Sequence, residues 1–285
     1  GVKVQVANQT DKERKVRVQA VMTDPKGVDP AGETVPLTIP PHSTGEVDIP
    51  LVLSNVKPWS PDNPDLYTLS VEVWDAAGGD HSKDPAHLLD NRSIRVGVRT
   101  VEITEKGLVL NGSLFPEKLI GGNRHQDFAR LGNAVPNNLQ WQDAVKLRKA
   151  GMRVIRSAHY PQDPAFMDAC DRLGLFVIVA TPGWQFWGRG PFADRVYDDI
   201  RQMVRRDRNH PSVMMWEPIL NETHYPADFA KKARDLVHEE YPYKGCYTAC
   251  DAVAQGSQHY EALYAHPVTG DKHWSIKERK NSKPY

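Results

Sequence analysis

Two carboxylates stand close together near the end of one apolar run. In the segment VMMWEPILNETHYP, residues 213–226, a run with the character of a buried strand leads into Glu217, and Asn221-Glu222 follow. A buried, ionised carboxylate is unfavourable unless it is paired or hydrogen-bonded. The segment therefore indicates either an internal ion pair or a carboxyl group used in acid–base chemistry.

The elements that must position these carboxylates alternate between strand-like and helix-like runs after Thr100. Strand-like runs lie within residues 114–122, 152–160, 175–184 and 213–222, each leads into a helix-like run, and another lies within 247–252. Gly151 and Gly174 stand where helix C-terminal caps belong. Repeated strand–helix units indicate a parallel sheet, and the unbroken apolar run LFVIVA fits a sheet buried on both faces. We expect a (β/α) barrel rather than an open doubly wound sheet.

The first third of the chain has a different rhythm. Apolar and polar residues alternate in short runs within residues 2–6, 15–21, 45–53, 66–74 and 93–98, and turn-rich clusters such as DPKGVDPAGE and PWSPDNPD separate them. Several short strands with turn signals between them, and no helical periodicity, predict an antiparallel β-sandwich.

Active sites of parallel barrels lie at the C-terminal ends of the strands. The residues that follow the strand-like runs are, in order, Asn123-Arg124-His125, Ser157-Ala158-His159-Tyr160, Gly183-Trp184 with Trp187 close behind, Asn221-Glu222, and Asp251. This mixture of residues suits a sugar substrate. Polar groups can bind the hydroxyls, flat aromatic rings can contact the ring faces, and a carboxyl group can transfer a proton.

The order and spacing of several motifs resemble glycoside hydrolase family 2, the group of β-galactosidases, β-glucuronidases and β-mannosidases. The motifs are spread along nearly the whole chain: WSPDNPDLYTL, VGVRTVEI, GLVLNGSLF, GGNRHQDF, MRVIRSAHYP, DRLGLFVIV and RRDRNHPSVMMWEPILNE. The resemblance implies an immunoglobulin-like β-sandwich over residues 1–97, a bridge over 98–116 and a TIM-barrel catalytic domain over 117–285. It further implies a fragment, with first sandwich strands missing and about six of eight barrel units present.

The resemblance implies an exo-acting, retaining glycosidase that cleaves terminal β-glycosides with two glutamates. Glu222 matches the general acid/base, which protonates the glycosidic oxygen and then deprotonates water. For this role we expect a pKa raised by partial burial and by a second carboxylate. Asn221 would hydrogen-bond the sugar 2-hydroxyl.

Four further residues match sugar-binding positions of the family or the rim of the barrel. His159 and His125 would bind sugar hydroxyls, with a satisfied histidine in a buried network as the alternative. Arg124 belongs to the same first-strand pair as His125, and we expect it to brace a carboxylate inside the barrel rather than to touch substrate. Trp184, like Trp187, is either a stacking platform or simple packing.

Departures from the family pattern limit the assignment. Leu220 stands where the family usually has glycine before the Asn-Glu pair. Residues 180–184 read ATPGW where some members carry an acidic metal ligand, so we expect no magnesium site and no cofactor. Glu217 shares a strand face with Asn221, not with Glu222, because side chains alternate along a strand. We therefore expect it to pair with Arg156 or Arg124.

The second glutamate of the family, the nucleophile, has no match in this sequence. It lies in a short motif that ends Glu-Tyr/Trp-Gly, and residues 283–285, Lys-Pro-Tyr, resemble the approach to that strand. Asp251, Glu261 and Glu278 are the candidate substitutes. Without a nucleophile we expect little or no hydrolysis by these 285 residues.

Composition narrows the partners. The chain has 36 basic and 36 acidic residues and no basic stripe, which argues against nucleic acid. No apolar run approaches the length of a membrane helix. Cys170, Cys246 and Cys250 are too few and unevenly spaced for a disulfide framework. Unpaired edges of an open barrel would favour a homo-oligomer. The compartment is not assigned from the sequence.

Two rival functions use the same residues. A non-catalytic carbohydrate-binding or scaffold protein would keep the aromatics and histidines without needing a protonated Glu222. A glutamate before Tyr/Trp-Gly in the sequence beyond residue 285 would favour the enzyme over this binding protein. A metal-dependent barrel hydrolase would need about three protein ligands at the strand ends. His125, His159 and Glu222 are the candidates for those ligands.

Overall fold

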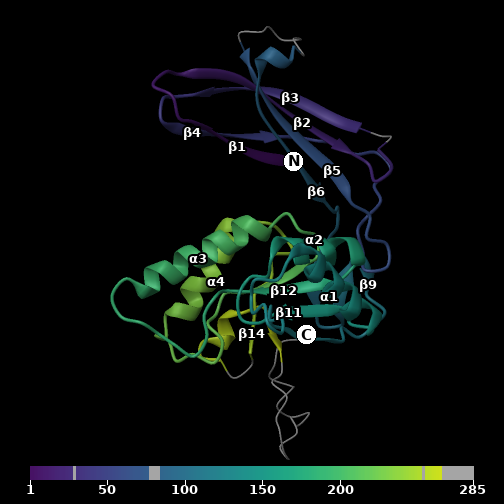
Figure 1. Cartoon of the computed structure of the whole chain (residues 1–285), viewed down its shortest axis with the longest axis vertical. Coiled ribbons are helices and arrows are strands. Elements are labelled where there is room, and N and C mark those ends of the chain that lie inside the picture. Colours follow the sequence, from purple (N-terminus) through teal and green to yellow (C-terminus); the bar gives the residue numbers. More distant parts are fainter. Residues whose placement is uncertain (28–29, 77–83, 252–253, 265–285) are drawn as a thin grey trace, which may run out of the picture. The chain divides into compact units, whose positions relative to one another are not determined.

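The computed structural model describes residues 1–27, 30–76, 84–251 and 254–264 (Figure 1). The chain divides into two compact units, one formed by Gly1–Lys57 with Asp65–Val98 and the other by Pro58–Pro64 with Arg99–Tyr285. Segment 58–64 thus groups with the second unit, although the sequence placed it in the sandwich. The boundaries drawn at residues 97 and 116 stay predictions.

The first unit is an antiparallel β-sandwich. One sheet has the strand order β3-β2-β5-β6, and β1 pairs with β4 in the other. The strands are β1 (Val2–Asn8), β2 (Arg14–Thr23), β3 (Pro30–Ile39), β4 (Ser43–Ile49), β5 (Tyr67–Asp75) and β6 (Leu88–Val96), and a short 3₁₀ turn, η2 (Pro85–His87), precedes β6.

Alternation along the strands fills the core of the sandwich. Val16, Val18 and Ala20 point inward from β2 at every second position and are nearly inaccessible to solvent. Ile39, Ile49, Leu69 and Val73 complete this core.

Strand β3 is a difference from the sequence-based expectation, which treated residues 24–33 as a turn cluster and assigned no strand to Pro30–Ile39. The whole strand pairs with β2, from Arg14 opposite Ile39 to Thr23 opposite Pro30. Ladder pairing with a strong central strand outweighs the weak strand propensity of Pro30, Gly32 and Pro36.

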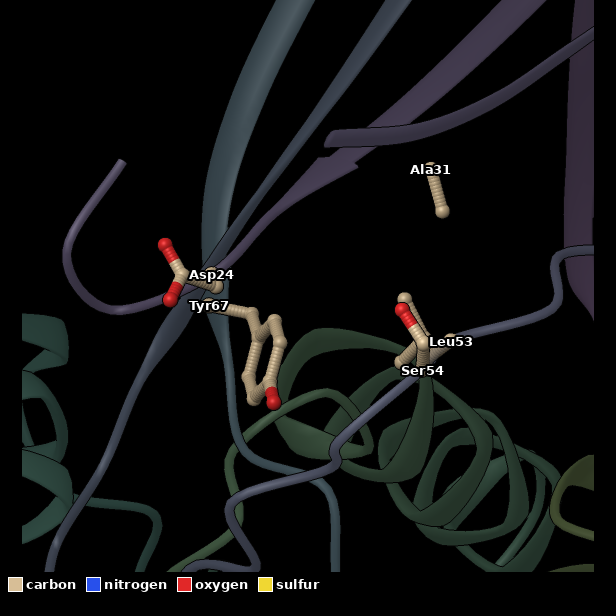
Figure 2. Close-up of a pocket in the computed structure, with 5 residues that line it drawn as sticks. All are labelled: Asp24, Ala31, Leu53, Ser54 and Tyr67. Atoms are coloured by element: carbon tan, nitrogen blue, oxygen red, sulfur yellow. The ribbon is translucent and has the colours of Figure 1, made fainter. Parts of the chain in front are cut away.

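A small pocket in the sandwich unit is lined by Asp24, Ala31, Leu53, Ser54 and Tyr67 (Figure 2). The Asp24 carboxylate already accepts a hydrogen bond from Lys57 Nζ at 3.0 Å. The Tyr67 hydroxyl accepts one from the Lys57 backbone N–H at 2.9 Å. The pocket is too small for a sugar ring, and its polar groups are engaged within the sandwich itself.

The second unit begins with a three-stranded antiparallel sheet, β7 (Val101–Thr104), β8 (Gly107–Leu110) and β9 (Ser113–Leu114), and continues as strand–helix units. The later strands are β10 (Gly121–Arg124), β11 (Val154–Ser157), β12 (Phe176–Ala180), β13 (Val213–Glu217), β14 (Ala249–Asp251) and β15 (Ala262–Tyr264). Between them lie α1 (Asn137–Lys149), α2 (Pro164–Leu173), α3 (Phe192–Asp207), α4 (Phe229–Glu240) and the 3₁₀ turn η3 (Ser257–His259). None of the helices in the described chain is long and apolar enough to cross a membrane.

The parallel strands follow one another in chain order, as barrel strands do. β10, β11, β12 and β13 form one parallel sheet, and β14 and β15 form another parallel pair. The parallel bridge between Trp216 and Thr248 joins the two sets, with Trp216 N–H donating to Tyr247 O at 2.9 Å. This confirms the predicted combination of a β-sandwich with a (β/α) barrel arrangement, of which the described residues supply six successive strands.

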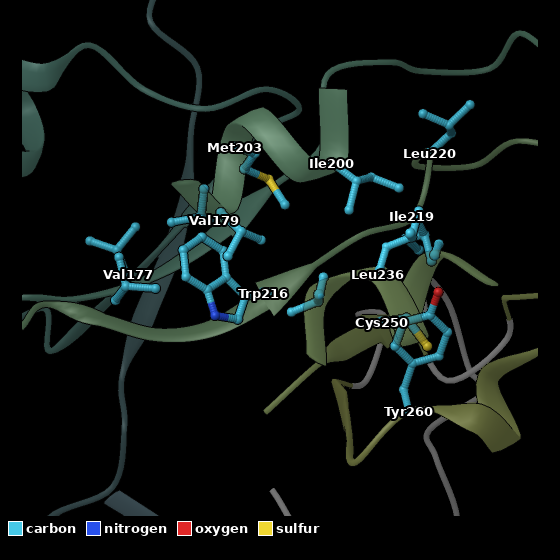
Figure 3. Packing of buried hydrophobic residues seen from close by; sticks show 14 of the residues in the cluster. Val177, Val179, Ile200, Met203, Trp216, Ile219, Leu220, Leu236, Cys250 and Tyr260 are labelled. Carbon is cyan, nitrogen blue, oxygen red and sulfur yellow. The ribbon is translucent and has the colours of Figure 1, made fainter. Parts of the chain in front are cut away.

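One large apolar cluster joins the strands and helices of this unit (Figure 3). Val177 and Val179 of β12 and Trp216 of β13 are buried in it together with Ile200 and Met203 of α3. Successive residues of both strands are buried, all of them in β13 and all but Ile178 in β12, so both faces of the sheet are covered and the strands are apolar without alternation. Helix α1 lies beside α2, and α3 beside α4 (Figure 1).

Segment 58–64 packs against the loop that closes α2. Trp59 is fully buried, its indole N–H donates to Asp171 O at 2.8 Å, and its ring meets Phe176 edge-on with centroids 5.6 Å apart. Gly174 ends α2 in the left-handed region at φ 69°, and an added Cβ there would lie 2.0 Å from Pro61 O. The predicted cap position therefore also requires glycine for close packing.

Candidate active site

The carboxyl ends of four adjacent strands bring the candidate residues to one edge of the sheet. His125 directly follows β10, one residue separates His159 from the end of β11, and Trp184 lies in the loop after β12. Strand β13 ends earlier than the sequence suggested, at Glu217, since Pro218 has no N–H to continue the ladder. Asn221, which is buried, and Glu222, which is exposed, therefore stand on a turn beyond the strand rather than at its last position.

The Glu222 carboxylate is held by the loop after β12. Its Oε2 accepts hydrogen bonds from Trp184 Nε1 at 3.1 Å and from Gln185 Nε2 at 2.8 Å. The backbone of Glu222 is left-handed, at φ 49°, a conformation that costs a non-glycine residue about 1–2 kcal/mol. The side chain is exposed, so the expectation of partial burial at this carboxyl group was wrong.

His159 lies between the other aromatic candidates. Its ring is 5.3 Å from that of His125 in an edge-to-face arrangement and 5.6 Å from that of Trp184. Burial, together with the positive charge of Arg156 and the neighbouring His125, lowers the pKa of His159 from 6.5 to about 4, against the opposing effect of Glu222. The imidazole is therefore neutral at neutral pH and can both donate and accept hydrogen bonds. The peptide bond between Ala158 and His159 is cis.

The second carboxylate of the opening motif is paired inside the sheet. Glu217 is fully buried, and the Arg156 guanidinium binds both of its oxygens, with Nε to Oε2 at 2.6 Å. Arg156 Nη2 also donates to Asn221 Oδ1 at 2.9 Å. The expected pairing of Glu217 with an arginine is thus confirmed, and the same arginine orients the Asn221 amide.

Arg124 does not join the others. Its guanidinium is buried and donates to Gln140 Oε1 at 2.7 Å and to Asp143 Oδ2 at 2.9 Å, both on α1. It lies over the Phe166 ring of α2, with Cζ 4.0 Å from the centroid. Arg124 therefore binds the first two helices of the unit to β10, and its side chain is directed away from Glu222.

The two tryptophans of the loop have different surroundings. Trp187 packs against Phe192, Phe229 and Tyr225, with centroid distances of 5.4, 5.0 and 6.5 Å. Trp184 is 53% exposed, and its N–H faces Glu222. The stacking role considered for both residues is therefore open to Trp184 alone of the pair.

Metal-binding geometry does not coincide with this edge. In the described part of the chain, the group with ligand atoms close enough for a metal ion is Asp168, Asp171 and His210, and His125, His159 and Glu222 do not form one. His210 Nδ1 and Asp171 Oδ2 are 2.6 Å apart, and Asp171 Oδ1 accepts from Ser212 N–H at 3.0 Å. His210 precedes β13, so this group lies at the opposite end of the strand from Glu222, and an internal ion pair accounts for its contacts.

Gln185 was missed by the sequence reasoning. It follows Trp184 in the loop after β12, so the rule that selected Trp184 extends to it by one residue. Glutamine in an exposed loop carries no chemical signal of its own, and only the position of Glu222 reveals what its amide does.

Two models of one family match the chain. The TIM barrel domain of glycosyl hydrolases family 2 matches residues 101–239, and the model named for glycosyl hydrolases family 2 matches residues 1–99. Together they cover both units.

Relatives and solved structures agree with these matches. A β-galactosidase of Thermoanaerobacter pseudethanolicus is 36% identical over 189 residues, or 66% of this chain and 24% of that protein. A putative β-glucuronidase of Formosa agariphila is 30% identical over 220 residues, covering 75% of this chain and 24% of that protein. A crystal structure of a glycosyl hydrolase family 2 member from Bacteroides cellulosilyticus superposes with a TM-score of 0.79 at 25% identity, covering 92% of this chain and 36% of that one. The chain spans about a quarter of the length of these curated relatives.

Proposed function

Because this chain belongs to family 2 of the glycosyl hydrolases, we propose that it carries the acid/base side of a retaining β-glycosidase site, with Glu222 as the proton donor and acceptor. One observation carries the proposal. The Glu222 carboxylate is fixed by Trp184 and Gln185 at the carboxyl edge of parallel strands, in electrostatic contact with His159. This is the edge at which barrel enzymes place their chemistry.

The proposed reaction has two steps. In the first, a nucleophilic carboxylate attacks the anomeric carbon, the bond to the glycosidic oxygen breaks, and the proton of Glu222 moves to the leaving oxygen. In the second, Glu222 removes a proton from water, the oxygen of that water bonds to the anomeric carbon, and the nucleophile leaves. The configuration of the sugar is retained after two inversions.

The neighbouring groups suit the binding of a terminal sugar. Arg156 occupies the Asn221 Oδ1 atom as a donor, so the amide Nδ2 is oriented to donate to the sugar 2-hydroxyl. Neutral His159 and the adjacent His125 would bind other hydroxyls, and the exposed ring of Trp184 would contact a sugar face. For Arg124 we propose a structural role, since its guanidinium faces α1 and α2.

We propose that the nucleophile lies outside these 285 residues and that the chain by itself does not hydrolyse glycosides. Glu217 is occupied by Arg156, and Glu261 is bound by Arg234 and by Thr248. Burial alone would raise the pKa of Glu261, but hydrogen bonds from His238, Thr248 and Arg234 lower it to about 2. Of the other two candidates, Asp251 is buried at the end of β14, and Glu278 lies outside the described residues.

The sugar we propose is a terminal β-galactoside, because the relative at 36% identity is named a β-galactosidase. The relative named a putative β-glucuronidase provides the comparison for the test. A preference for 4-nitrophenyl β-glucuronide over 4-nitrophenyl β-galactoside by the active protein would contradict the galactoside assignment.

The acid/base role is tested in a longer polypeptide that supplies the nucleophile. Glu222→Ala should lower kcat by about 10²–10⁴-fold on substrates with poor leaving groups. The loss should be much smaller with dinitrophenyl glycosides, whose leaving group needs no proton. Glu239→Ala, at an exposed position of α4, is the matched control. Equal losses with both classes of leaving group would refute the role, and hydrolysis by the 285-residue chain itself would refute the missing nucleophile.

A further inference from the structure

Two hydrogen-bond donors from consecutive residues converge on a single oxygen of Glu222. The indole N–H of Trp184 and the side-chain amide of Gln185 both donate to Oε2, at 3.1 and 2.8 Å. A carboxyl group that exchanges a proton has two chemically equivalent oxygens until the protein distinguishes them. Convergence on one oxygen makes that distinction.

The backbone of this loop is locked to the turn that carries Glu222. Trp184 forms a parallel bridge with Asn221, and Gln185 N–H donates to Asn221 O at 3.1 Å. Gly183 N–H donates to His159 O at 3.3 Å, and an added Cβ on Gly183 would lie 2.6 Å from Leu220 Cδ2. The contact between Gln185 and Glu222 is therefore set by a fixed register of two segments.

Gln185 adopts an unfavourable backbone conformation to reach this position. Its φ is 54° and that of Glu222 is 49°, so two non-glycine residues that face each other are both left-handed. Such conformations cluster where the surrounding structure fixes a functional geometry. The Gln185 side chain is exposed, so its amide contributes polar contacts rather than core packing.

We propose that Gln185 is a positioning residue for Glu222, and that its amide, together with the Trp184 indole, holds Oε2 and thereby assigns proton transfer to Oε1. This inference rests on the proposed acid/base role of Glu222. An oxygen that accepts two N–H donors has both lone pairs engaged, and a proton on it would displace a donor. Glu222 therefore releases its proton to the leaving oxygen from Oε1 and recovers it there from water, while Oε2 stays anchored.

The inference is tested without turnover, in the 285-residue chain. The Trp184 indole N–H touches Glu222, so its ¹⁵N and ¹H shifts report the protonation of that carboxyl group. With ¹⁵N-labelled tryptophan, Trp184→Phe identifies the Trp184 signal among the seven tryptophans. Glu222→Gln should abolish the titration step that belongs to Glu222. This identification matters because His159, whose pKa is about 4, titrates nearby, and Arg156 and His125 also face the site.

Hydrogen bonds to the ionised form lower the pKa of a carboxyl group. Gln185→Met, which removes the donor at similar length, should therefore raise the Glu222 pKa by about one pH unit. Gln185→Glu, which opposes Oε2 with a second carboxylate, should raise it further. Gln202→Met, at an exposed position on α3, is the control and should leave the titration unchanged.

An unchanged Glu222 titration in Gln185→Met overturns the proposal. So does loss of the native Trp184 signal in both Gln185 variants, because the side chain would then be structural. In the longer, active polypeptide, Gln185→Met should move the basic limb of the kcat profile upward in pH by the same shift. Absence of any hydrolysis there would defeat the proposed function while leaving the indole titration interpretable, so the two failures are distinguishable.

Discussion

The titration of the His159 imidazole makes the stability of the folded chain depend on pH in the acidic range. Its pKa in the folded chain is about 4, while the ordinary value is 6.5. Between these values the unfolded chain binds a proton at His159 and the folded chain does not, so stability increases with pH across this range. The low pKa thus keeps a neutral ring beside Glu222 but makes the fold sensitive to acid.

This sensitivity can be measured with His159→Gln, which cannot titrate. The free energy of unfolding of the wild-type chain should fall more steeply between pH 6.5 and pH 4 than that of the variant. Urea unfolding at several pH values gives both slopes. Parallel slopes for the two proteins would mean that His159 is not neutral in the folded state.

The buried pair of Arg156 and Glu217 supports the site, because Arg156 also donates to Asn221. Arg156→Met would leave the Glu217 carboxylate buried and unpaired, at a cost of about 3–5 kcal/mol in the free energy of unfolding. The double variant Arg156→Met with Glu217→Leu should recover most of that loss, because it removes both charges. Arg156 also lowers the pKa of His159, so histidine NMR of a folded Arg156 variant should show that pKa rising. A double variant no more stable than the single one would argue that Arg156 acts by packing.

At the residue scale, the sequence predicts contacts that follow from the local pattern of residues. It misses contacts that depend on which two segments pair and in which register. The arginine partner predicted for Glu217 is correct, but the alternation that separated Glu217 from Glu222 assumed one continuous strand, and β13 ends at Glu217. Nothing in the sequence states that the loop after β12 bonds to Asn221, so Gln185 and the exposure of Glu222 became visible only in the structure.

Among the elements, α2 shows best why one position needs a particular residue. Gly174 and Gly132 are both left-handed, at φ 69° and 56°, but an added Cβ meets Pro61 O at 2.0 Å only at Gly174, and meets nothing within 4 Å at Gly132. Gly132→Ala should cost about 1–2 kcal/mol from backbone strain alone. Gly174→Ala should cost a further 1–3 kcal/mol or so, because backbone atoms must move. Thermal unfolding compares the stability of the two variants. Equal losses of stability would show that segment 58–64 can move without a cost in free energy.

The elements also show where sequence patterns fail. Helices α1 to α4 and strands β11, β12 and β14 are predicted close to their observed bounds, since long apolar or amphipathic runs leave few alternatives. Strand β10 lies later than the run assigned to residues 114–122, and β15 was not predicted. Strand β3 was missed because Pro30, Gly32 and Pro36 carry turn signals, and its existence depends on pairing with β2 along its whole length. Tertiary pairing of that kind has no local signature.

For the whole molecule, the feature that bears on association is the outer edge of strand β10 in the parallel sheet. Among the described strands, β10 pairs only with β11, so its other edge offers backbone donors and acceptors to another strand. Ile120, the residue before β10, is 64% exposed, and Leu114, in the preceding strand β9, is 53% exposed. An edge of this kind, bordered by apolar surface, favours pairing between copies of the chain.

We therefore expect the 285-residue chain to self-associate as its concentration rises, and the association to pass through this edge. Ile120→Lys combined with Leu114→Lys should weaken it at least tenfold in Kd, because the charges must be desolvated for the strands to meet. Val52→Lys is the matched control, since Val52 is 88% exposed in the sandwich unit. Light scattering over a concentration series measures all three proteins. A wild-type chain that stays monomeric, or a control that dissociates as readily as the double variant, would show that β10 does not provide the contact.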